Sequence, residues 1–288
     1  QHLLRTAIPK RPNLPDQVIG ILEKSDDVPP WTWKLVSGGG WNIDRGDWVY
    51  RDSVHSGVQY GRYDRGMLIQ RLQVTESGDL AVDERGVENI EAFFESRKHM
   101  YNSLYYHETS RVAFDMYCKC AERARELFRA GMPIHADPVM QQVLGADSSD
   151  ELPLNTLLAM TEGWWESHVH AWAHDAQDPI LKDFAERIVL RKPFKHFPDN
   201  DYNRSMLGKL VAEAGLDPNY YLLRIKPLPE KHKEDLDEAL LVQRRDGTLL
   251  PLTQKSRLLE AFSKMRKNAE TAMLAIPLEA FLTSPAMH

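Results

Sequence analysis

The longest regular feature of this 288-residue sequence is a helical periodicity that runs from about residue 87 to residue 130. Apolar side chains recur there every three or four positions, the spacing that places them on one face of an α-helix. The stretch stops at Gly131, and the arginines Arg123, Arg125 and Arg129 near its end suit the negative end of a helix dipole. The pattern predicts one long helix or two consecutive helices, and therefore a mainly α-helical protein.

Shorter patterns precede and follow this stretch. We expect helices at residues 15–24, 42–57, 64–72, 138–144, 152–174 and 179–191, and a hairpin at residues 72–82. Residues 1–195 form the first predicted domain, which is helical. After a segment rich in Pro, Asp and Asn, we expect strands at residues 220–225, 239–243, 249–252 and 272–276 and a helix at 256–267. Residues 196–288 are therefore predicted to form a small α+β C-terminal region.

The composition excludes several classes of protein. Of all residues 42% are hydrophobic and 27% are charged, the mean hydropathy is −0.48, and no long apolar run occurs. These values exclude a membrane-spanning, collagen-like or broadly disordered chain. With 36 Lys and Arg against 42 Asp and Glu, the net charge is −6, so a nucleic-acid partner is not indicated.

The two cysteines, Cys118 and Cys120, fall in a predicted helix. Residues two apart on a helix point to different faces, so we expect no disulfide between them. This cysteine use favours a reducing compartment, and we expect a cytoplasmic protein. The sequence starts with QHLL, without an initiator Met or the regions of a signal peptide, so we expect that an upstream part is missing.

The side chains best suited to chemistry lie on the predicted helix at residues 42–57. At about 100° per residue, one arc of this helix carries Asp44, Trp48, Arg51, Asp52 and His55. Two carboxylates, an arginine, a histidine and an aromatic ring on one face suit a binding or catalytic site. The same spacing also suits a solvated face with ion pairs four residues apart, and spacing alone favours this second interpretation.

Residues 42–58, with the sequence NIDRGDWVYRDSVHSGV, resemble a motif block of HD-domain phosphohydrolases, especially of their deoxynucleoside triphosphate triphosphohydrolase branch. Residues 97–107 resemble a helix of that branch, and residues 178–195 resemble a later one. The resemblance covers residues 15–200 well and the C-terminal region loosely, and it implies that the helical domain at residues 1–195 is HD-type. It implies a metal-dependent enzyme of nucleotide metabolism that hydrolyses a deoxynucleoside triphosphate to the nucleoside and triphosphate.

The resemblance also implies roles for single residues. Asp44 matches a catalytic carboxylate that ligates a divalent cation of the Mg, Mn or Fe class, and such a cation lowers the pKa of a bound water so that it can attack phosphorus. Arg45 and Arg97 match residues that contact phosphates. Asp52 matches the acceptor of the sugar 3′-hydroxyl group, and Tyr105 matches the tyrosine that packs on the sugar.

Four further residues are expected near the substrate. Tyr101 lies between Arg97 and Tyr105 at four-residue spacing, and His55 shares the arc of Asp44. Trp48 stands where the family usually has Tyr, so an indole N–H replaces a hydroxyl group. His107 points about 160° away from Tyr105 on a regular helix, which leaves a packing role as open as substrate contact.

The metal ligands that the resemblance implies are incomplete. The family builds its site from a His, an adjacent His-Asp pair and the Asp matched by Asp44, but no His-Asp pair precedes Asp44 here. We therefore expect sequence upstream of this chain to supply the other ligands. The alternative is a catalytically silent HD-like module that binds nucleotide or assembles with partners. The resemblance also implies a homo-oligomer.

Two other patterns give weaker alternatives. His170 and His174, one helical turn apart with Asp175 or Glu166 nearby, could share a cation. No third ligand follows at a recognised spacing, and the tryptophans beside them favour ordinary packing. The three glycines at residues 38–40 lack the Lys and Ser or Thr of a phosphate-binding loop, so we interpret them as a connection.

Overall fold

A computed structural model describes residues 13–227, 240–264 and 272–282. Contacts divide the chain into two compact units, Gln1–Tyr105 with Pro229–Asn268 and Tyr106–Leu228 with Ala269–His288. Each unit therefore combines an earlier and a later part of the sequence. The sequence predicted two domains that meet between residues 195 and 196, and this division stays a prediction. Parts of the strand expected at 239–243 and of the helix expected at 256–267 lie outside the described residues.

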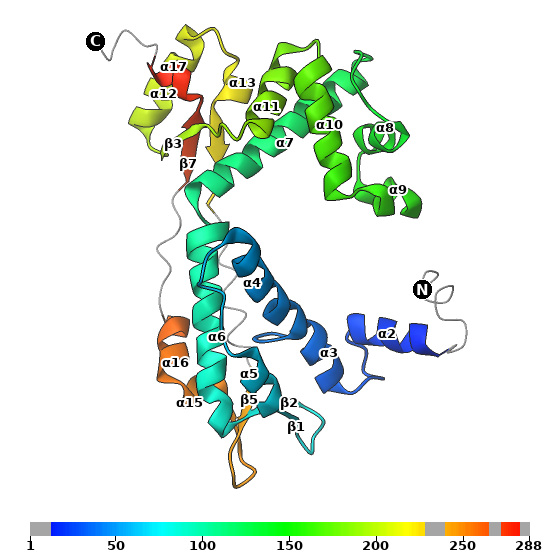
Figure 1. Cartoon of the computed structure of the whole chain (residues 1–288), viewed down its shortest axis with the longest axis vertical. Helices are drawn as coiled ribbons and strands as arrows, with labels where there is room; N and C mark the ends of the chain where they lie inside the picture. Colours follow the sequence, from blue (N-terminus) through cyan, green and yellow to red (C-terminus); the bar gives the residue numbers. More distant parts are fainter. Residues whose placement is uncertain (1–12, 228–239, 265–271, 283–288) are drawn as a thin grey trace. The chain divides into compact units, whose positions relative to one another are not determined.

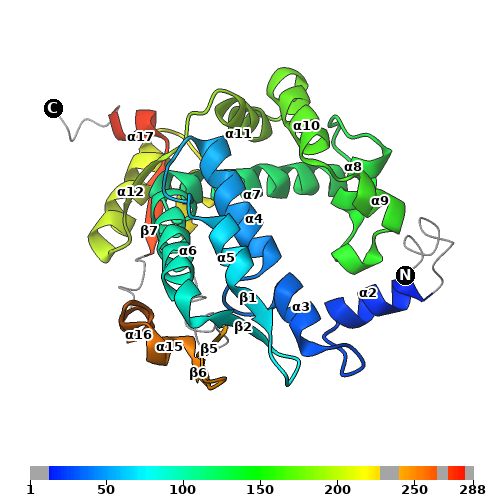
Figure 2. The same cartoon turned by 60° about the horizontal axis from the view of Figure 1, so that its bottom comes forward.

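Helices make up most of the first unit (Figure 1). They are α2 (Leu14–Leu22), α3 (Pro30–Ser37), α4 (Ile43–Ser56), α5 (Arg65–Arg71), the short 3₁₀ turn η1 (Glu84–Gly86), α6 (Val87–Met100), the π-helical turn η2 (Tyr101–Tyr105), α15 (Leu252–Lys255) and α16 (Arg257–Lys264). Helix α4 packs against α6, and α16 contacts α6 as well, as Figures 1 and 2 show. Buried Val49, Phe93 and Met100 belong to the apolar core of this unit.

A four-stranded sheet, in the order β1-β2-β5-β6, completes the first unit. Its strands are β1 (Leu72–Val74), β2 (Leu80–Asp83), β5 (Leu241–Gln243) and β6 (Leu249–Pro251). The predicted hairpin at residues 72–82 is confirmed, because β1 pairs with β2 in antiparallel register. Strand β5 pairs with β2 in parallel, with Val82 opposite Val242. The later part of the chain thus extends a sheet that the early hairpin begins.

The second unit is built around a long helix, α7 (Glu108–Arg129). The other helices are α8 (Pro138–Gly145), η3 (Ser149–Glu151), α9 (Leu154–Ala159), α10 (Glu162–Asp175), α11 (Pro179–Val189), α12 (Asp201–Glu213), α13 (Pro218–Tyr221) and α17 (Leu278–Leu282). Three strands, β3 (Lys195–Pro198), β4 (Leu223–Ile225) and β7 (Met273–Ile276), form an antiparallel sheet with β7 in the centre.

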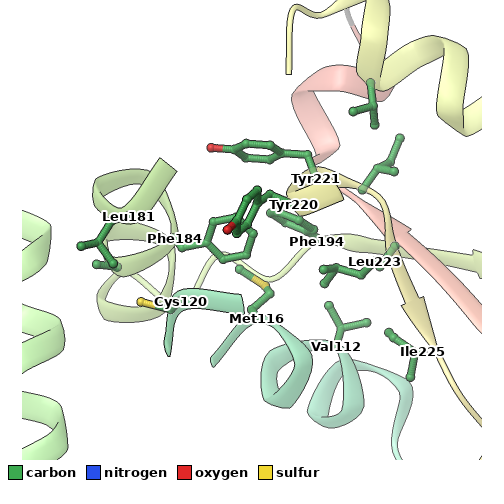
Figure 3. Packing of buried hydrophobic residues seen from close by; sticks show 14 of the residues in the cluster. Val112, Met116, Cys120, Leu181, Phe184, Phe194, Tyr220, Tyr221, Leu223 and Ile225 are labelled. Carbon is green, nitrogen blue, oxygen red and sulfur yellow. The ribbon is translucent and has the colours of Figure 1, made fainter. Parts of the chain in front are cut away.

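The core of the second unit joins α7, α11, α13 and β4. Figure 3 shows Val112, Met116 and Cys120 on α7 beneath aromatic side chains that come from later segments. Phe184 contacts Phe194, Tyr220 and Tyr221 with ring centroids 5.4 to 6.3 Å apart. Because Cys120 is buried and Cys118 is exposed, the predicted placement of the two cysteines on different faces is confirmed.

The predicted fold class, mainly α with a small α+β part, is confirmed. The long periodicity at residues 87–130 is two helices, α6 and α7, with a π-helical turn between them. The predicted single helix at 152–174 is wrong, because a new helix begins after Thr161, whose side chain caps α10 by accepting from the Trp164 N–H. The predicted strand at 220–225 is shorter, since residues 218–221 form α13. Among the described helices, none has the length and apolar character needed to cross a membrane.

Candidate functional site

Helix α4 carries the motif block and is bounded by two local signals. The side-chain oxygen of Asn42 accepts from the Arg45 backbone N–H at 2.7 Å, and the amide group of Asn42 donates to the Gly38 carbonyl at 2.7 Å. Gly57, with φ of 75°, ends the helix in the left-handed conformation that glycine adopts without strain. The helix predicted at residues 42–57 is therefore confirmed, and its ends are fixed by its own sequence.

One face of α4 is held by close packing at Gly46. A Cβ atom at this position would lie 2.8 Å from Nε1 of Trp41 and 2.9 Å from the hydroxyl oxygen of Tyr63. The Tyr63 hydroxyl donates to the Gly46 carbonyl at 3.1 Å, and Trp41 donates to that hydroxyl at 3.2 Å. Because only glycine leaves room for these contacts, this position sets the rotation of α4 about its axis.

Three rings from α4 and from the π-helical turn form an aromatic cluster, Trp48, Tyr101 and Tyr105. The centroid of Trp48 lies 5.8 Å from that of Tyr101 and 5.6 Å from that of Tyr105, and the two tyrosines are 5.1 Å apart. All three pairs are edge-to-face, the arrangement that the ring quadrupole favours. π-Helical turns are rare and recur at functional sites. Here the turn brings two tyrosines onto one tryptophan.

Arg97 lies against this aromatic cluster. Its side chain is only 8% exposed. The guanidinium carbon is 4.8 Å from the ring centroid of Tyr101 and 5.9 Å from that of Trp48, and Nη2 donates to the Tyr101 hydroxyl at 3.5 Å. A guanidinium group over aromatic faces keeps its charge and its planar set of donors. Such a group suits an anionic ligand.

Asp52 contacts the aromatic cluster through a hydrogen bond with Tyr105. The Tyr105 hydroxyl donates to Oδ2 of Asp52 at 2.5 Å. Burial and this hydrogen bond to a carboxylate both raise the pKa of the Tyr105 hydroxyl well above its ordinary value. The phenol is therefore a hydrogen-bond donor at neutral pH, and Asp52 accepts from it.

The structure brings together five of the expected site residues, namely Trp48, Asp52, Arg97, Tyr101 and Tyr105. The other residues of α4 lie differently. Asp44 and His55 are exposed, and Nη1 of Arg45 donates to the Gly40 carbonyl at 2.9 Å. Arg51 forms an ion pair with Asp47, four residues earlier. The sequence-based alternative of ion pairs four residues apart on α4 is thus confirmed for Asp47 and Arg51.

His107 belongs to the second unit, where it caps α7. Its Nδ1 accepts from the backbone N–H of Thr109 at 3.2 Å. The expectation that it continues the helix of Tyr105 is wrong, because the chain leaves the helical conformation before α7 begins. A contact of His107 with substrate stays a prediction.

A protein metal site needs several donor side chains around one point. In the described ranges, no three His, Cys, Asp or Glu side chains are placed to hold one ion. His170 and His174 are exposed on α10, while the third histidine of that helix, His168, is buried and hydrogen-bonds through Nδ1 to the Trp164 carbonyl at 2.9 Å. Asp44 has no hydrogen bond or ion pair with another described residue. Its role as a metal ligand stays a prediction.

Two cavities lie outside the aromatic cluster. One of about 550 Å³ in the second unit is lined by α7, α10 and the end of α11, and includes Tyr117, His170 and Arg191. Arg191 has φ of 53°, a conformation usual for glycine after a helix. The other cavity, of about 300 Å³ in the first unit, is almost wholly apolar. The sequence did not predict the first cavity, which Arg191 and Lys192 help to line at the end of the helix predicted at residues 179–191.

Comparisons with known proteins find one matching family model and solved structures with a similar fold. Residues 63–153 match a family model described as the HD associated region. A phosphohydrolase from Bacteroides thetaiotaomicron, of known crystal structure, superposes with a TM-score of 0.81 at 21% identity over 96% of this chain and 70% of its own. A hypothetical protein from Aquifex aeolicus superposes with a TM-score of 0.62 at 21% identity, over 92% of this chain and 62% of its own.

Curated relatives are longer than this chain. The uncharacterized protein YwfO of Bacillus subtilis is 27% identical over 244 residues, which cover 78% of this chain and 53% of YwfO. An uncharacterized protein of Methanocaldococcus jannaschii is 33% identical over 86 residues, or 29% of this chain and 19% of that protein. The chain thus spans about half or less of the curated relatives it matches. It matches the HD associated region over residues 63–153 and shares the fold of a solved phosphohydrolase.

Proposed function

We propose that this chain is part of an HD-type, metal-dependent phosphohydrolase that acts on nucleotides. The substrate we propose is a deoxynucleoside triphosphate, cleaved to the nucleoside and triphosphate. The match to the HD associated region and the fold of a solved phosphohydrolase support the general class. The substrate rests on the motif block of α4 and on the side chains that meet it.

The observation that carries the proposal is the meeting of an acidic, a basic and an aromatic group at one place. Asp52 on α4 accepts from Tyr105, and the guanidinium group of Arg97 lies over the rings of Trp48 and Tyr101. These residues come from segments about fifty positions apart. A carboxylate for a hydroxyl group, a cation for phosphate and rings for a sugar or base are the chemical groups that a nucleotide needs.

Each side chain has a proposed role in binding. Arg97 pairs with phosphate oxygens, where a planar guanidinium donates two parallel hydrogen bonds. Arg45, at the first turn of α4, adds a second positive charge for the phosphates. Asp52 accepts from a sugar hydroxyl group, and Tyr105 packs its ring on the sugar. Trp48, Tyr101 and His55 are proposed to contact the substrate, and for His107 substrate contact and a packing role are equal alternatives.

The described residues do not by themselves fit a metal ion, since Asp44 is exposed and without partner ligands among them. We therefore derive no catalytic step through a metal. We propose that Asp44 joins ligands from sequence outside these 288 residues, which is compatible with a relative of which the match covers only 53%. Assembly as a homo-oligomer in the cytoplasm also belongs to the proposal.

The exposed position of Asp44 favours a second candidate function. A helical module without its own metal ligands would bind nucleotide through Arg97 and Asp52 without cleaving it. The coding sequence upstream of Gln1 distinguishes the two candidate functions. A His followed by a His-Asp pair there supports the enzyme, and their absence supports the silent module.

The activity test compares two carboxylates on the first turns of α4. The protein made from its complete coding sequence is incubated with Mn²⁺ or Mg²⁺ and each deoxynucleoside triphosphate, and the released triphosphate is measured. Asp44→Asn is expected to abolish hydrolysis. Asp47→Asn, which removes only an exposed ion pair with Arg51, is the control and is expected to retain it. No hydrolysis by the unmodified protein, or full activity of Asp44→Asn, would contradict the enzyme.

A further inference from the structure

The hydrogen bond between Tyr105 and Asp52 uses one of the two carboxylate oxygens. The phenol donates to Oδ2 at 2.5 Å. In residues 13–227, 240–264 and 272–282, no other group hydrogen-bonds or pairs with this carboxylate. An ionised carboxylate accepts at both oxygens. Oδ1 is therefore available to a donor on a ligand.

The donor is held more firmly than the acceptor. The ring of Tyr105 has edge-to-face contacts with Trp48, at an interplanar angle of 74°, and with Tyr101, at 67°. It also ends the π-helical turn that continues α6. Tyr105 is thus fixed by its backbone and by two rings, which leaves its hydroxyl group at a set position.

Asp52 gains orientation from this donor. The residue is half-buried on the third turn of α4, and its neighbour Ser53 is buried and donates to the Val58 carbonyl at 2.7 Å. The backbone at Asp52 is therefore anchored, but a short carboxylate side chain still has several rotamers. A hydrogen bond from a fixed phenol selects one of them. An acceptor that is already oriented loses less conformational freedom when a ligand binds.

We propose that Tyr105 is the positioning residue for Asp52: its hydroxyl group holds the carboxylate so that Oδ1 accepts a hydrogen bond from a sugar hydroxyl group of the nucleotide. The inference rests on the proposed function, because it needs a nucleotide in this site. It differs from packing of the Tyr105 ring on a sugar, since it depends on the hydroxyl group and not on the ring.

The test removes the hydroxyl group from the protein and from the ligand in turn. Tyr105→Phe keeps the ring contacts and loses the donor. Dissociation constants of the 288-residue chain are measured by titration calorimetry for the tightest-binding of the four deoxynucleoside triphosphates and for its 2′,3′-dideoxy analogue. Tyr105→Phe is expected to weaken the deoxynucleotide about tenfold and to leave the dideoxy analogue within about twofold. Tyr60→Phe, at an exposed tyrosine stacked on His99, is the control.

A second variant separates positioning from a change in the fold. With Asp52→Asn already present, adding Tyr105→Phe is expected to have little further effect on the deoxynucleotide, because the two residues act as one unit. Melting temperatures of all variants are compared. The positioning role is supported if Tyr105→Phe has the melting temperature of the unmodified chain but a smaller difference in affinity between the two ligands.

The other outcomes overturn the proposal in distinct ways. Tighter binding of the deoxynucleotide by Tyr105→Phe means that the phenol competes with the ligand for Asp52. Equal weakening of both ligands means that the hydroxyl group acts elsewhere. Equal affinity of the unmodified chain for both ligands means that the protein does not recognise the sugar hydroxyl group, although it still binds nucleotide. No binding of any nucleotide by the unmodified chain overturns the proposed function, and the positioning role with it.

Discussion

Arg123 and Asp178 form a two-point ion pair that joins α7 to α11 inside the second unit. Nε of Arg123 lies 3.0 Å from Oδ1 of Asp178, and Nη2 lies 2.6 Å from Oδ2. The same carboxylate caps α11 by accepting from the Leu181 backbone N–H at 2.8 Å. One side chain thus both starts a helix and ties it to its neighbour.

This pair predicts a specific dependence of stability on pH. Burial alone would raise the pKa of Asp178, but the hydrogen bonds from Arg123 and Leu181 outweigh burial and hold it below its ordinary value. A lowered pKa in the folded state contributes stability above the unfolded value near 3.9, and this stability is lost as the pH falls through the lower folded value. Asp178→Asn is expected to cost about 1–3 kcal/mol at pH 7 and less below pH 4.

Urea denaturation of the chain at pH 7, 5, 4 and 3, followed by circular dichroism, measures this difference. Asp175→Asn, at an exposed position near the end of α10, is the matched control and is expected to change little at any pH. Stability differences between Asp178→Asn and the unmodified chain that stay constant with pH would contradict the role of the ion pair.

The Tyr105 phenol is expected to resist titration. Burial and the hydrogen bond to Asp52 raise its pKa, so it stays protonated at a pH where an exposed tyrosine ionises. In Asp52→Asn the negative charge is gone, and the pKa is expected to fall towards the ordinary value of 10. The ¹³Cζ resonance of labelled tyrosine, assigned with Tyr105→Phe, reports both titrations. An unchanged pKa in Asp52→Asn would show that the hydrogen bond is absent in solution.

Arg97 is expected to bind the phosphates of a nucleotide. Arg97→Gln removes the charge at similar length and is expected to weaken a deoxynucleoside triphosphate by about 2 kcal/mol, roughly thirtyfold. The parent nucleoside has no phosphate, so its affinity should not change. Arg51→Gln is the control, because Arg51 is exposed and pairs with Asp47. Equal loss of triphosphate and nucleoside affinity would instead indicate a role in the fold.

The two cysteines are expected to react very differently. Burial raises the pKa of Cys120 to about 12, whereas Cys118 is exposed on the same helix. A thiolate is the reactive form, so a disulfide reagent at pH 8 should modify Cys118 in the native chain and Cys120 only after denaturant is added. Cys118→Ser should remove the native reaction, and Cys120→Ser should preserve it. Two native reactions would contradict the buried position of Cys120.

Local signals in the sequence were enough to predict most of the helices. Helix α4 lies within the predicted residues 42–57, and the hairpin predicted at residues 72–82 forms from β1 and β2. The break at Thr161 was missed because apolar periodicity continues across it, and a single capping residue is a weak signal. Helix α12 was missed because its mixed polar sequence follows a segment that resembles a loop.

The candidate site was predictable in part. The resemblance pointed to Asp52 and Arg97, which lie at one cluster, but the motif block also carries Asp44 and His55, which are exposed. The spacing of Tyr101 and Tyr105 assumed a regular helix. Their actual positions depend on a π-helical turn, which no local sequence pattern predicted.

The sequence by itself determined the helical class, the ends of α4 and the separation of Cys118 from Cys120, because caps, turns and helical periodicity act between residues that are close along the chain. Only the tertiary structure decided which groups meet. The contact between Tyr105 and Asp52 joins residues 53 positions apart. It depends on the rotation of α4 set at Gly46 and on the widened turn after α6, and both follow from packing between helices.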